Sequence, residues 1–477
     1  MNQKRTAGTR IAGLFCAAVV CLLALPCVAL AAGREPLQLS VWSVVPFALL
    51  LLCIAVLPLA AGRFWHNDRN KAVVVAVLAA PVVLYLAYLH ATTGQKSLYP
   101  LVHELGKYAS FIILLGSLYT VAGGVVVRGD LKPTALNNGG ILLFGAVLAN
   151  VIGTTGASVL LIRLLLRINS GRKNNVHLPV FFIFLVSNLG GCLTPLGDPP
   201  LFIGYLNGVP FTWTLGLWPE YLVVVGLVLG VFLVWDILAL RGARHVTHLP
   251  DETRKHNGAE PVGVDGTINL LLLAGIMAAV LIESHWFPET LDRLWNLFGG
   301  ELLMLVMAGL SLYFTPRTLR VANSFTWAPI SEVAILFAGI FITIVPALQL
   351  LEAHGPTLGL TEPWQFFWGT GFLSAALDNA PTYLAFATTA AASNDYNLLV
   401  ENQVPGLNGP MVLRAISCGA VFMGALSYIG NGPNFMVKAI AEQAGYRPPS
   451  FFGYSLYAGV ILVPIFVLVT FLFFLPQ

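Results

Sequence analysis

The chain has 477 residues, of which 57% are hydrophobic and only 10% are charged. A soluble domain carries roughly 25% charged residues, so too few remain here to cover a surface that faces water. The composition therefore predicts a protein that lies in a lipid bilayer. The net charge is +3, and no basic cluster with interleaved aromatic residues indicates a nucleic-acid partner. The six cysteines lie in apolar stretches without metal-ligand spacing, which indicates small buried side chains and no metal cofactor.

The N-terminal segment, residues 1–32, has the pattern of a signal peptide. Three basic residues precede an apolar run, and Ala29-Leu30-Ala31 has the small residues of a cleavage site. The alternative is an uncleaved first membrane helix with its N-terminus in the cytoplasm. Either interpretation places Gly33 outside the cell, and a cleaved chain would begin there.

The sequence after this segment predicts an all-α polytopic membrane protein. A membrane-crossing helix needs about 20 apolar residues. The segments of suitable length are 41–61, 71–91, 109–127, 214–240, 267–285, 297–315, 329–351 and 452–475. Two longer apolar stretches, 139–168 and 364–392, have small or polar centres. We expect each of these two to be a re-entrant hairpin that enters and leaves the membrane on the same side.

Two further apolar segments, 178–206 and 411–440, are interrupted by a motif that occurs twice. The first contains Thr194-Pro195-Leu196-Gly197-Asp198-Pro199-Pro200, and the second contains Ser427-Tyr428-Ile429-Gly430-Asn431-Gly432-Pro433-Asn434, 233 positions later. A break in a membrane helix frees backbone groups that lipid cannot satisfy, so it persists only where it lines a protected cavity. Broken helices in corresponding places of two halves indicate the binding site of a transporter.

The placement of basic residues indicates two inverted halves. Cytoplasmic loops collect Lys and Arg, and all but five of the 25 fall on one side if the loop after 41–61 is cytoplasmic; the exceptions are Arg34, Lys96, Lys107, Arg293 and Arg414. The polar stretch 241–266 is then a cytoplasmic linker between the repeats 41–240 and 267–475. Each repeat has five crossings, one of which is the broken helix, and in addition one re-entrant hairpin. Because five is odd, the second repeat is inverted relative to the first.

Matching residues support this repeat. At an offset of 233, Gly191, Thr194, Gly197 and Pro200 match Gly424, Ser427, Gly430 and Pro433, and at an offset of 229, Asn150 in the first hairpin matches Asn379 in the second. Asn431 matches Asp198 in the same way, so the second break lacks the charge of the first.

Asp198 and Asp378 are the two acids at the predicted discontinuities. A carboxylate inside a membrane is costly and indicates function. Sodium is a hard cation that prefers oxygen ligands, and a carboxylate that holds sodium when ionised and a proton when neutral would exchange the two. The alternative is that both acids cap the N-termini of half-helices.

Polar side chains beside the same discontinuities are candidate oxygen ligands, with helix capping as the alternative for each. They are Asn150, Thr154, Thr155, Asn379 and Thr382 in the hairpins, and Asn188, Thr194, Ser427, Asn431 and Asn434 at the breaks. Gly197, Gly430 and Gly432 would allow the backbone angles that a sharp break needs.

The other acids in apolar segments are expected to have structural roles. We expect Asp236 to pair with Arg241, about one turn later, near the membrane interface. Three further acids lie near the predicted outer ends of their segments and are expected to be solvated: Glu220, Glu283 and Glu301.

Enzymatic motifs are missing from the sequence. His103-Glu104 lies in a predicted outside loop and is followed by Leu105-Gly106-Lys107, so it does not form the HExxH motif of zinc proteases. No GxSxG nucleophile elbow and no Walker A loop occur. The sequence therefore predicts neither an enzyme nor a step driven by ATP within this chain.

With these motifs the chain resembles the ion transporter superfamily from about residue 40 to 475. The resemblance is carried by the two hairpin tips and by the breaks Gly197-Asp198-Pro199-Pro200 and Gly430-Asn431-Gly432-Pro433-Asn434. It is greatest to NhaD-like sodium/proton antiporters and to citrate-transporter-like (CitMHS-like) proteins. The resemblance implies a scaffold with a moving transport domain, an elevator-type motion and a homodimer. The Ser-Asn-Thr triplets that the dicarboxylate carriers of this fold have at their hairpin tips are absent here.

The sequence thus predicts a secondary sodium/proton antiporter of a bacterial-type inner membrane, with Na⁺ and protons as its transported ions. Asp198 and Asp378 would be the exchanging carboxylates, with Asn150 and Asn379 as further Na⁺ ligands. The alternative is a Na⁺- or H⁺-coupled carrier of citrate or another small carboxylate. No Lys or Arg lies at a tip or break to bind an anion, although the N-termini of half-helices could supply partial positive charge.

Overall fold

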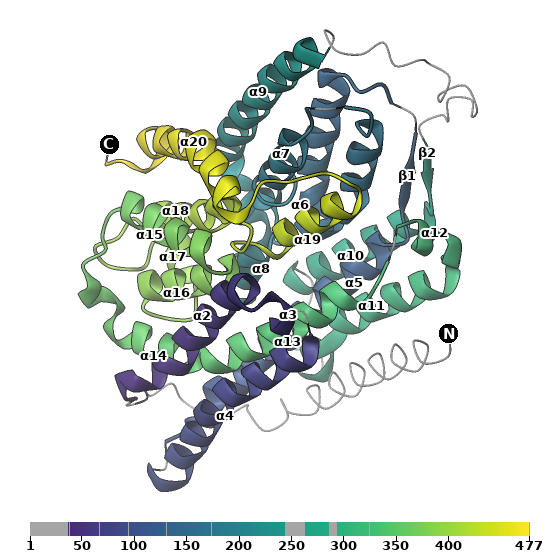
Figure 1. Ribbon diagram of the computed structural model, residues 1–477. Helices are drawn as coiled ribbons and strands as arrows, with labels where there is room; N and C mark the ends of the chain where they lie inside the picture. The colour runs from purple at the N-terminus through teal and green to yellow at the C-terminus, as the bar shows by residue number, and fades with distance from the viewer. Residues whose placement is uncertain are drawn as a thin grey trace.

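The computed structural model describes residues 37–476 with the exception of 38, 66, 94, 130, 173, 244–262, 286–292 and 324. The predicted signal peptide 1–32 and most of the predicted linker 241–266 therefore lie outside the described residues. The regular structure of the described part is helical, apart from one short antiparallel pair formed by β1 (Val126–Arg128) and β2 (Gly263–Asp265) (Figure 1).

The predicted membrane spans are helices in the structure. They are α2 (Val45–Ala60), α4 (Asp68–Thr93), α5 (Leu98–Ala122), α9 (Trp218–Ala243), α10 (Ile268–His285), α11 (Arg293–Phe314), the pair α13 (Ala328–Thr343) and α14 (Val345–His354), and α20 (Phe451–Val469). By length and composition, seven helices in the described part could cross a membrane, or eight if α13 and α14, bent by 43°, form one span. The chain is a multi-pass helical membrane protein.

The helix α6 (Ala135–Ile168) turns back on itself at Gly153. This glycine has φ 77° and ψ 155°, a conformation that side chains disfavour. The side-chain amides of Asn138 and Asn169, near opposite ends of α6, donate hydrogen bonds to each other at 3.1 and 2.8 Å. A straight helix would separate them by roughly 45 Å at 1.5 Å per residue. The two halves of α6 therefore lie side by side, with Gly153 at the tip.

The second predicted hairpin consists of α15 (Pro363–Ala376) and α16 (Asn379–Ala391), which pack against each other. Each interrupted segment forms a helix, a short 3-10 turn and a second helix: α7 (His177–Leu185), η3 (Leu189–Leu193) and α8 (Pro199–Leu206) in the first, and α18 (Gly409–Met423), η7 (Gly424–Leu426) and α19 (Gly432–Gln443) in the second. Pro199 is the first residue of α8, where its missing N–H removes no helical hydrogen bond. Short connecting elements are α3 (Gly62–Trp65), α12 (Arg317–Ala322) and α17 (Asn397–Val400).

The long elements pack in two groups. The scaffold group contains α2, α4, α5, α10, α11 and α13, and we include α14 because it continues α13, although it packs more closely on α16 than on α13. The hairpin group contains α6, α7, α8, α9, α15, α16, α18, α19 and α20 (Figure 1). The helices α9 and α20 pack against broken helices rather than against the scaffold group. The two groups meet where α5 packs on α6 and α8, and where α14 packs on α16.

Three acids that were expected to be interfacial or solvated are buried and paired. Asp236 accepts hydrogen bonds from Arg172 at 2.6 Å and from His177 at 2.8 Å instead of pairing with Arg241. Neighbours on a helix face are three or four residues apart, so a residue five positions later points elsewhere. The remaining acids are Glu220, which pairs with Arg414 at 3.0 Å, and Glu301, which accepts from Ser110 at 2.5 Å. The side chain of Glu283 lies outside the described part.

Candidate functional site

Asp198 lies at the centre of the polar residues that the breaks and hairpin tips bring together. Its carboxylate is 1% exposed. It accepts hydrogen bonds from Thr154 Oγ1 at 2.9 Å, Asn379 Nδ2 at 2.5 Å and Asn431 Nδ2 at 2.9 Å. These donors belong to the tip of α6, the tip between α15 and α16, and the second break. All four discontinuities therefore meet at one carboxylate.

The backbone of Asp198 has the extended conformation of an N-cap before α8, but its side chain does not cap that helix. Asp378 does: its carboxylate accepts a hydrogen bond from Ala380 N at 3.4 Å, at the start of α16. Asp378 is also only half-buried, and it makes none of the hydrogen bonds to Asp198. The two acids thus have different environments, one fully enclosed by donors and the other at a helix terminus.

Besides the bond from Thr154 Oγ1 to Asp198, three hydrogen bonds join the tip of α6 to the first break. Thr154 N donates to the carbonyl of Gly197 at 2.8 Å, and Leu193 N donates to Asn150 Oδ1 at 2.8 Å. Thr194 Oγ1 donates to the carbonyl of Asn150 at 2.5 Å. Asn150 and Thr194 therefore hold the tip against the break, and neither of them contacts Asp198 directly.

The second break is held in the corresponding way. Ser427 Oγ donates to the carbonyl of Ala375, at the tip of the second hairpin, at 2.6 Å. Asn434 Nδ2 donates to the carbonyls of Gly424 and Ser427 at 3.0 and 2.9 Å. Asn188 Nδ2 donates to Asn434 Oδ1 at 2.7 Å and so connects the two breaks.

Two glycines are required by close backbone contacts in these breaks. A Cβ atom on Gly197 would overlap the carbonyl oxygen of Gly191, and a Cβ atom on Gly430 would lie 2.7 Å from the carbonyl oxygen of Gly424. The matched residues of the two repeats therefore make the same contact, glycine against glycine, in each break.

Two buried amide oxygens near the breaks lack a hydrogen-bond donor. Asn379 Oδ1 and Asn188 Oδ1 accept no hydrogen bond from a described residue. A buried polar atom without a partner costs about 1–3 kcal/mol. Hard cations such as Na⁺ take oxygen ligands, so the carboxylate of Asp198 and the amide of Asn379, which carries one of these oxygens, are suited to a cation.

A cavity adjoins Asp198 on the side of the scaffold group. It lies between the tip of α6, the first break and one face of α5, and its lining includes Phe111, Leu115, Leu118, Tyr119 and Phe202. No Lys, Arg or His is among its lining residues. The contribution of α5 was missed in the sequence, because that helix has no break or intramembrane acid to distinguish it from an ordinary span.

The cavity has a free volume of about 30 Å³, more than a single water molecule needs. A bare cation fits this space.

These features define a multi-pass membrane protein whose polar site lies at breaks in its helices. Residues 36–474 match the family model described as "Putative citrate transport", so the chain belongs to that family. This confirms the resemblance to citrate-transporter-like proteins of the ion transporter superfamily. No curated protein matches the chain. The family description names citrate, so it favours the carboxylate carrier, the alternative in the sequence analysis, over sodium/proton antiport.

Proposed function

We propose that the protein is a cation-coupled secondary transporter of citrate or a related small carboxylate, in which Asp198 binds the coupling cation. The observation that supports this most is the enclosure of Asp198 by donors from the hairpin tips and the second break. The coupling cation is Na⁺ or a proton, and the protein acts without a resident cofactor.

Electrostatics explains why a carboxylate substrate would need the cation. Two unit charges of the same sign 4 Å apart repel by about 4 kcal/mol at an effective dielectric constant of 20. Asp198 lines the cavity, and no basic side chain does. A cation on Asp198 would remove this repulsion and supply the positive charge that the lining residues lack. Substrate and cation would then bind together, which is the basis of coupled transport.

The same proposal gives the two packing groups their roles. The hairpin group would carry the site and move against the scaffold group, with α6 and the α15–α16 pair as oppositely oriented re-entrant hairpins of an inverted repeat. Matched contacts in the two breaks, such as Gly191 against Gly197 and Gly424 against Gly430, support this repeat. The orientation with most basic residues in the cytoplasm, an inner-membrane location and a homodimer complete the proposal.

Sodium/proton antiport is the second candidate, since the cavity accommodates a bare cation and offers no basic residue to an anion. In that case Asp198 would hold Na⁺ and H⁺ in turn, with Asp378 as a second exchanging carboxylate.

One transport experiment separates the two candidates. The full chain is reconstituted in liposomes with an internal pH dye, without ATP and at a clamped membrane potential. Accumulation of labelled citrate that requires an inward Na⁺ or H⁺ gradient supports the carboxylate carrier. A proton flux that follows a Na⁺ gradient without any carboxylate, with no accumulation of citrate or succinate, would contradict the carboxylate carrier and support the antiporter.

A further inference from the structure

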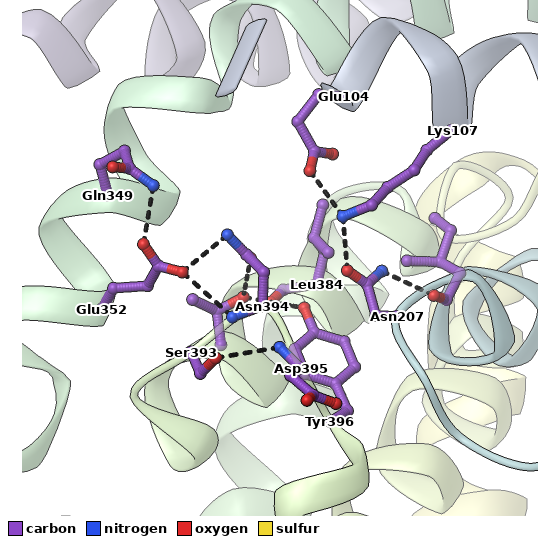
Figure 2. A network of polar contacts seen from close by, with 12 residues as sticks. Glu104, Lys107, Asn207, Gln349, Glu352, Leu384, Ser393, Asn394, Asp395 and Tyr396 are labelled. Atoms are coloured by element: carbon purple, nitrogen blue, oxygen red, sulfur yellow. Dashed lines mark hydrogen bonds and ion pairs between the residues drawn. The ribbon is translucent and has the colours of Figure 1, made fainter. Parts of the chain in front are cut away.

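A buried ion pair on α5 joins the scaffold group to the hairpin group. Lys107 Nζ donates to Glu104 Oε1 at 2.7 Å and to Asn207 Oδ1 at 2.6 Å, and Asn207 is the C-cap residue directly after α8 (Figure 2). Glu104 and Lys107 are 2% and 7% exposed. Glu104 Oε2 has no donor among the described residues. The pair thus lies inside a helix, not in the outside loop that was expected, and Asn207 is its partner in the hairpin group.

A second polar joint lies beside the first. Glu352 Oε1, on α14 of the scaffold group, accepts from Asn394 N at 3.0 Å and from Asn394 Nδ2 at 2.8 Å. Gln349 donates to the other oxygen of Glu352 at 2.7 Å. Asn394 follows α16 of the hairpin group, so this joint also crosses between the groups (Figure 2).

Hydrogen bonds link the two partners in the hairpin group. Tyr396 N donates to the carbonyl of Asn207 at 2.7 Å, which ties the segment after α16 to the end of α8. The hydroxyl of Tyr396 lies 2.8 Å from Thr388 Oγ1 and donates to the carbonyl of Leu384 at 3.1 Å. Because of these bonds, we expect a movement that separates Asn207 from Lys107 to pull Asn394 from Glu352 as well.

The Lys107–Asn207 joint lies close to the cavity. Phe111, which lines it, is one helical turn after Lys107 on α5. Phe202, which lines it from α8, lies next to Ile203, whose carbonyl accepts from Asn207 Nδ2 at 2.7 Å. The Lys107–Asn207 contact therefore connects α5 and α8, which both line the cavity, on the side where α15 begins and α16 ends.

We propose that the Lys107–Asn207 and Glu352–Asn394 contacts form a latch that keeps the cavity closed toward this side of the membrane. The latch rests on the proposed function in one respect, that the hairpin group moves against the scaffold group. By the distribution of basic residues this side is the outer one. Opening separates two charged side chains from their amide partners, so the latch biases the molecule toward the closed arrangement until other interactions, such as bound substrate and cation, favour opening.

Two isosteric substitutions act on the latch in opposite directions. Asn394→Asp places a carboxylate against Glu352, and like charges repel, so the latch weakens. Asn207→Asp places a carboxylate against Lys107, and the added ion pair strengthens the latch. The same substitution removes the hydrogen bond from Asn207 Nδ2 to the Ile203 carbonyl, but that bond lies within the hairpin group and does not cross the joint. Both variants change an amide into a carboxylate, so each controls for the effect of adding one negative charge. Neither residue contacts Asp198.

The measurement is the labelling rate of a reporter thiol, Leu115→Cys, which lines the cavity from α5. A membrane-impermeant maleimide is added from the outer side of vesicles that contain the full chain, and the background from the same chain without the reporter is subtracted. We expect labelling to be about fivefold faster with Asn394→Asp and about fivefold slower with Asn207→Asp, at the lower end of coupling between sites. The double variant should return toward the starting rate.

Melting temperature distinguishes a latch from a network that only stabilises the fold. A structural network would lower the melting temperature in the variants without changing labelling of the folded protein, and equal labelling in all four backgrounds would overturn the latch. The assay needs no substrate. Opposite shifts in labelling without any citrate uptake would therefore support the latch and contradict the proposed function. Normal citrate uptake with unchanged labelling would support the proposed function and contradict the latch.

Discussion

The two helix breaks have the same backbone contacts but different chemistry. In each break a glycine carbonyl closes on a second glycine, and a hydroxyl, of Thr194 or Ser427, binds the neighbouring hairpin tip. The first break carries Asp198, whereas the second carries Asn431, whose amide donates to that same carboxylate at 2.9 Å. The comparison indicates that the glycines and hydroxyls are shared by the two breaks, and that the residue before the second helix gives only the first break a charge.

Substitution of the glycines tests the backbone contact that the two breaks share, and it has the largest expected effect. Gly197→Ala and Gly430→Ala each place a Cβ against a backbone carbonyl that cannot rotate away. We expect each to lower the free energy of unfolding by about 3 kcal/mol, the upper range for overpacking. Thermal denaturation in detergent measures this.

Gly432→Ala is the matched control, because its Cβ would meet nothing within 4 Å. It should leave the melting temperature nearly unchanged. Equal stability of all three variants would show that the glycine contacts do not hold the breaks in shape.

Removal of the Asp198 charge tests the chemical difference between the two breaks. Asp198→Asn keeps the shape but loses the charge that three donors bind. Since a hydrogen bond to a charged group contributes about 1.5–3 kcal/mol, and each 1.4 kcal/mol is tenfold, we expect cation-dependent citrate uptake to fall about 100-fold. The measurement is initial uptake rate in liposomes at several Na⁺ concentrations and pH values.

Asp378→Asn is the matched control for the charge, because Asp378 caps α16 and is only half-buried. We expect uptake to fall less than about fivefold, because Asn caps a helix N-terminus about as well as Asp and only the charge is lost. If instead Asp378→Asn stops transport and Asp198→Asn does not, the assignment of the coupling site is reversed.

An exchange of the two residues sharpens the comparison further. Asn431→Asp alone brings a second carboxylate to the hydrogen-bond distance of Asp198, and we expect coupling by Na⁺ to be lost because the pair would hold a proton between them. With Asp198→Asn in addition, the charge has moved from the first break to the second. Uptake should then recover about tenfold over the Asn431→Asp variant, because the like-charge contact is gone.

Uptake in the double variant that is no better than in the worse single variant would show that the charge cannot be exchanged between the breaks. In that case the surroundings of Asp198, including Thr154 and Asn379, would determine the site, and the position of the charge alone would not.

The sequence predicted the parts of this site that have a recognisable pattern in neighbouring residues. Gly and Pro within an apolar segment reveal a break, and Asp198 is visible as an acid where lipid would exclude one. Residues that reach the site only through tertiary packing have no such pattern. Phe111 and Tyr119 line the cavity from a helix that reads as an ordinary span, and Asp236 pairs with Arg172, which is distant in sequence. Periodicity locates helices, but it does not tell which faces meet.

The smallest expected effect comes from the hydroxyl of the first break. Thr194→Ala removes one neutral hydrogen bond to a hairpin tip, which contributes about 1 kcal/mol. Ser427→Ala should lose more stability, because Ser427 Oγ also accepts from Ile429 N and Gly430 N at 3.2 and 3.0 Å. Both losses are measured as the free energy of unfolding in detergent. Neither hydroxyl is hydrogen-bonded to Asp198, so the Na⁺ concentration for half-maximal uptake should stay within about twofold of the unsubstituted protein. A selective change in Na⁺ dependence for Thr194→Ala would mean that this hydroxyl belongs to the cation site of the first break.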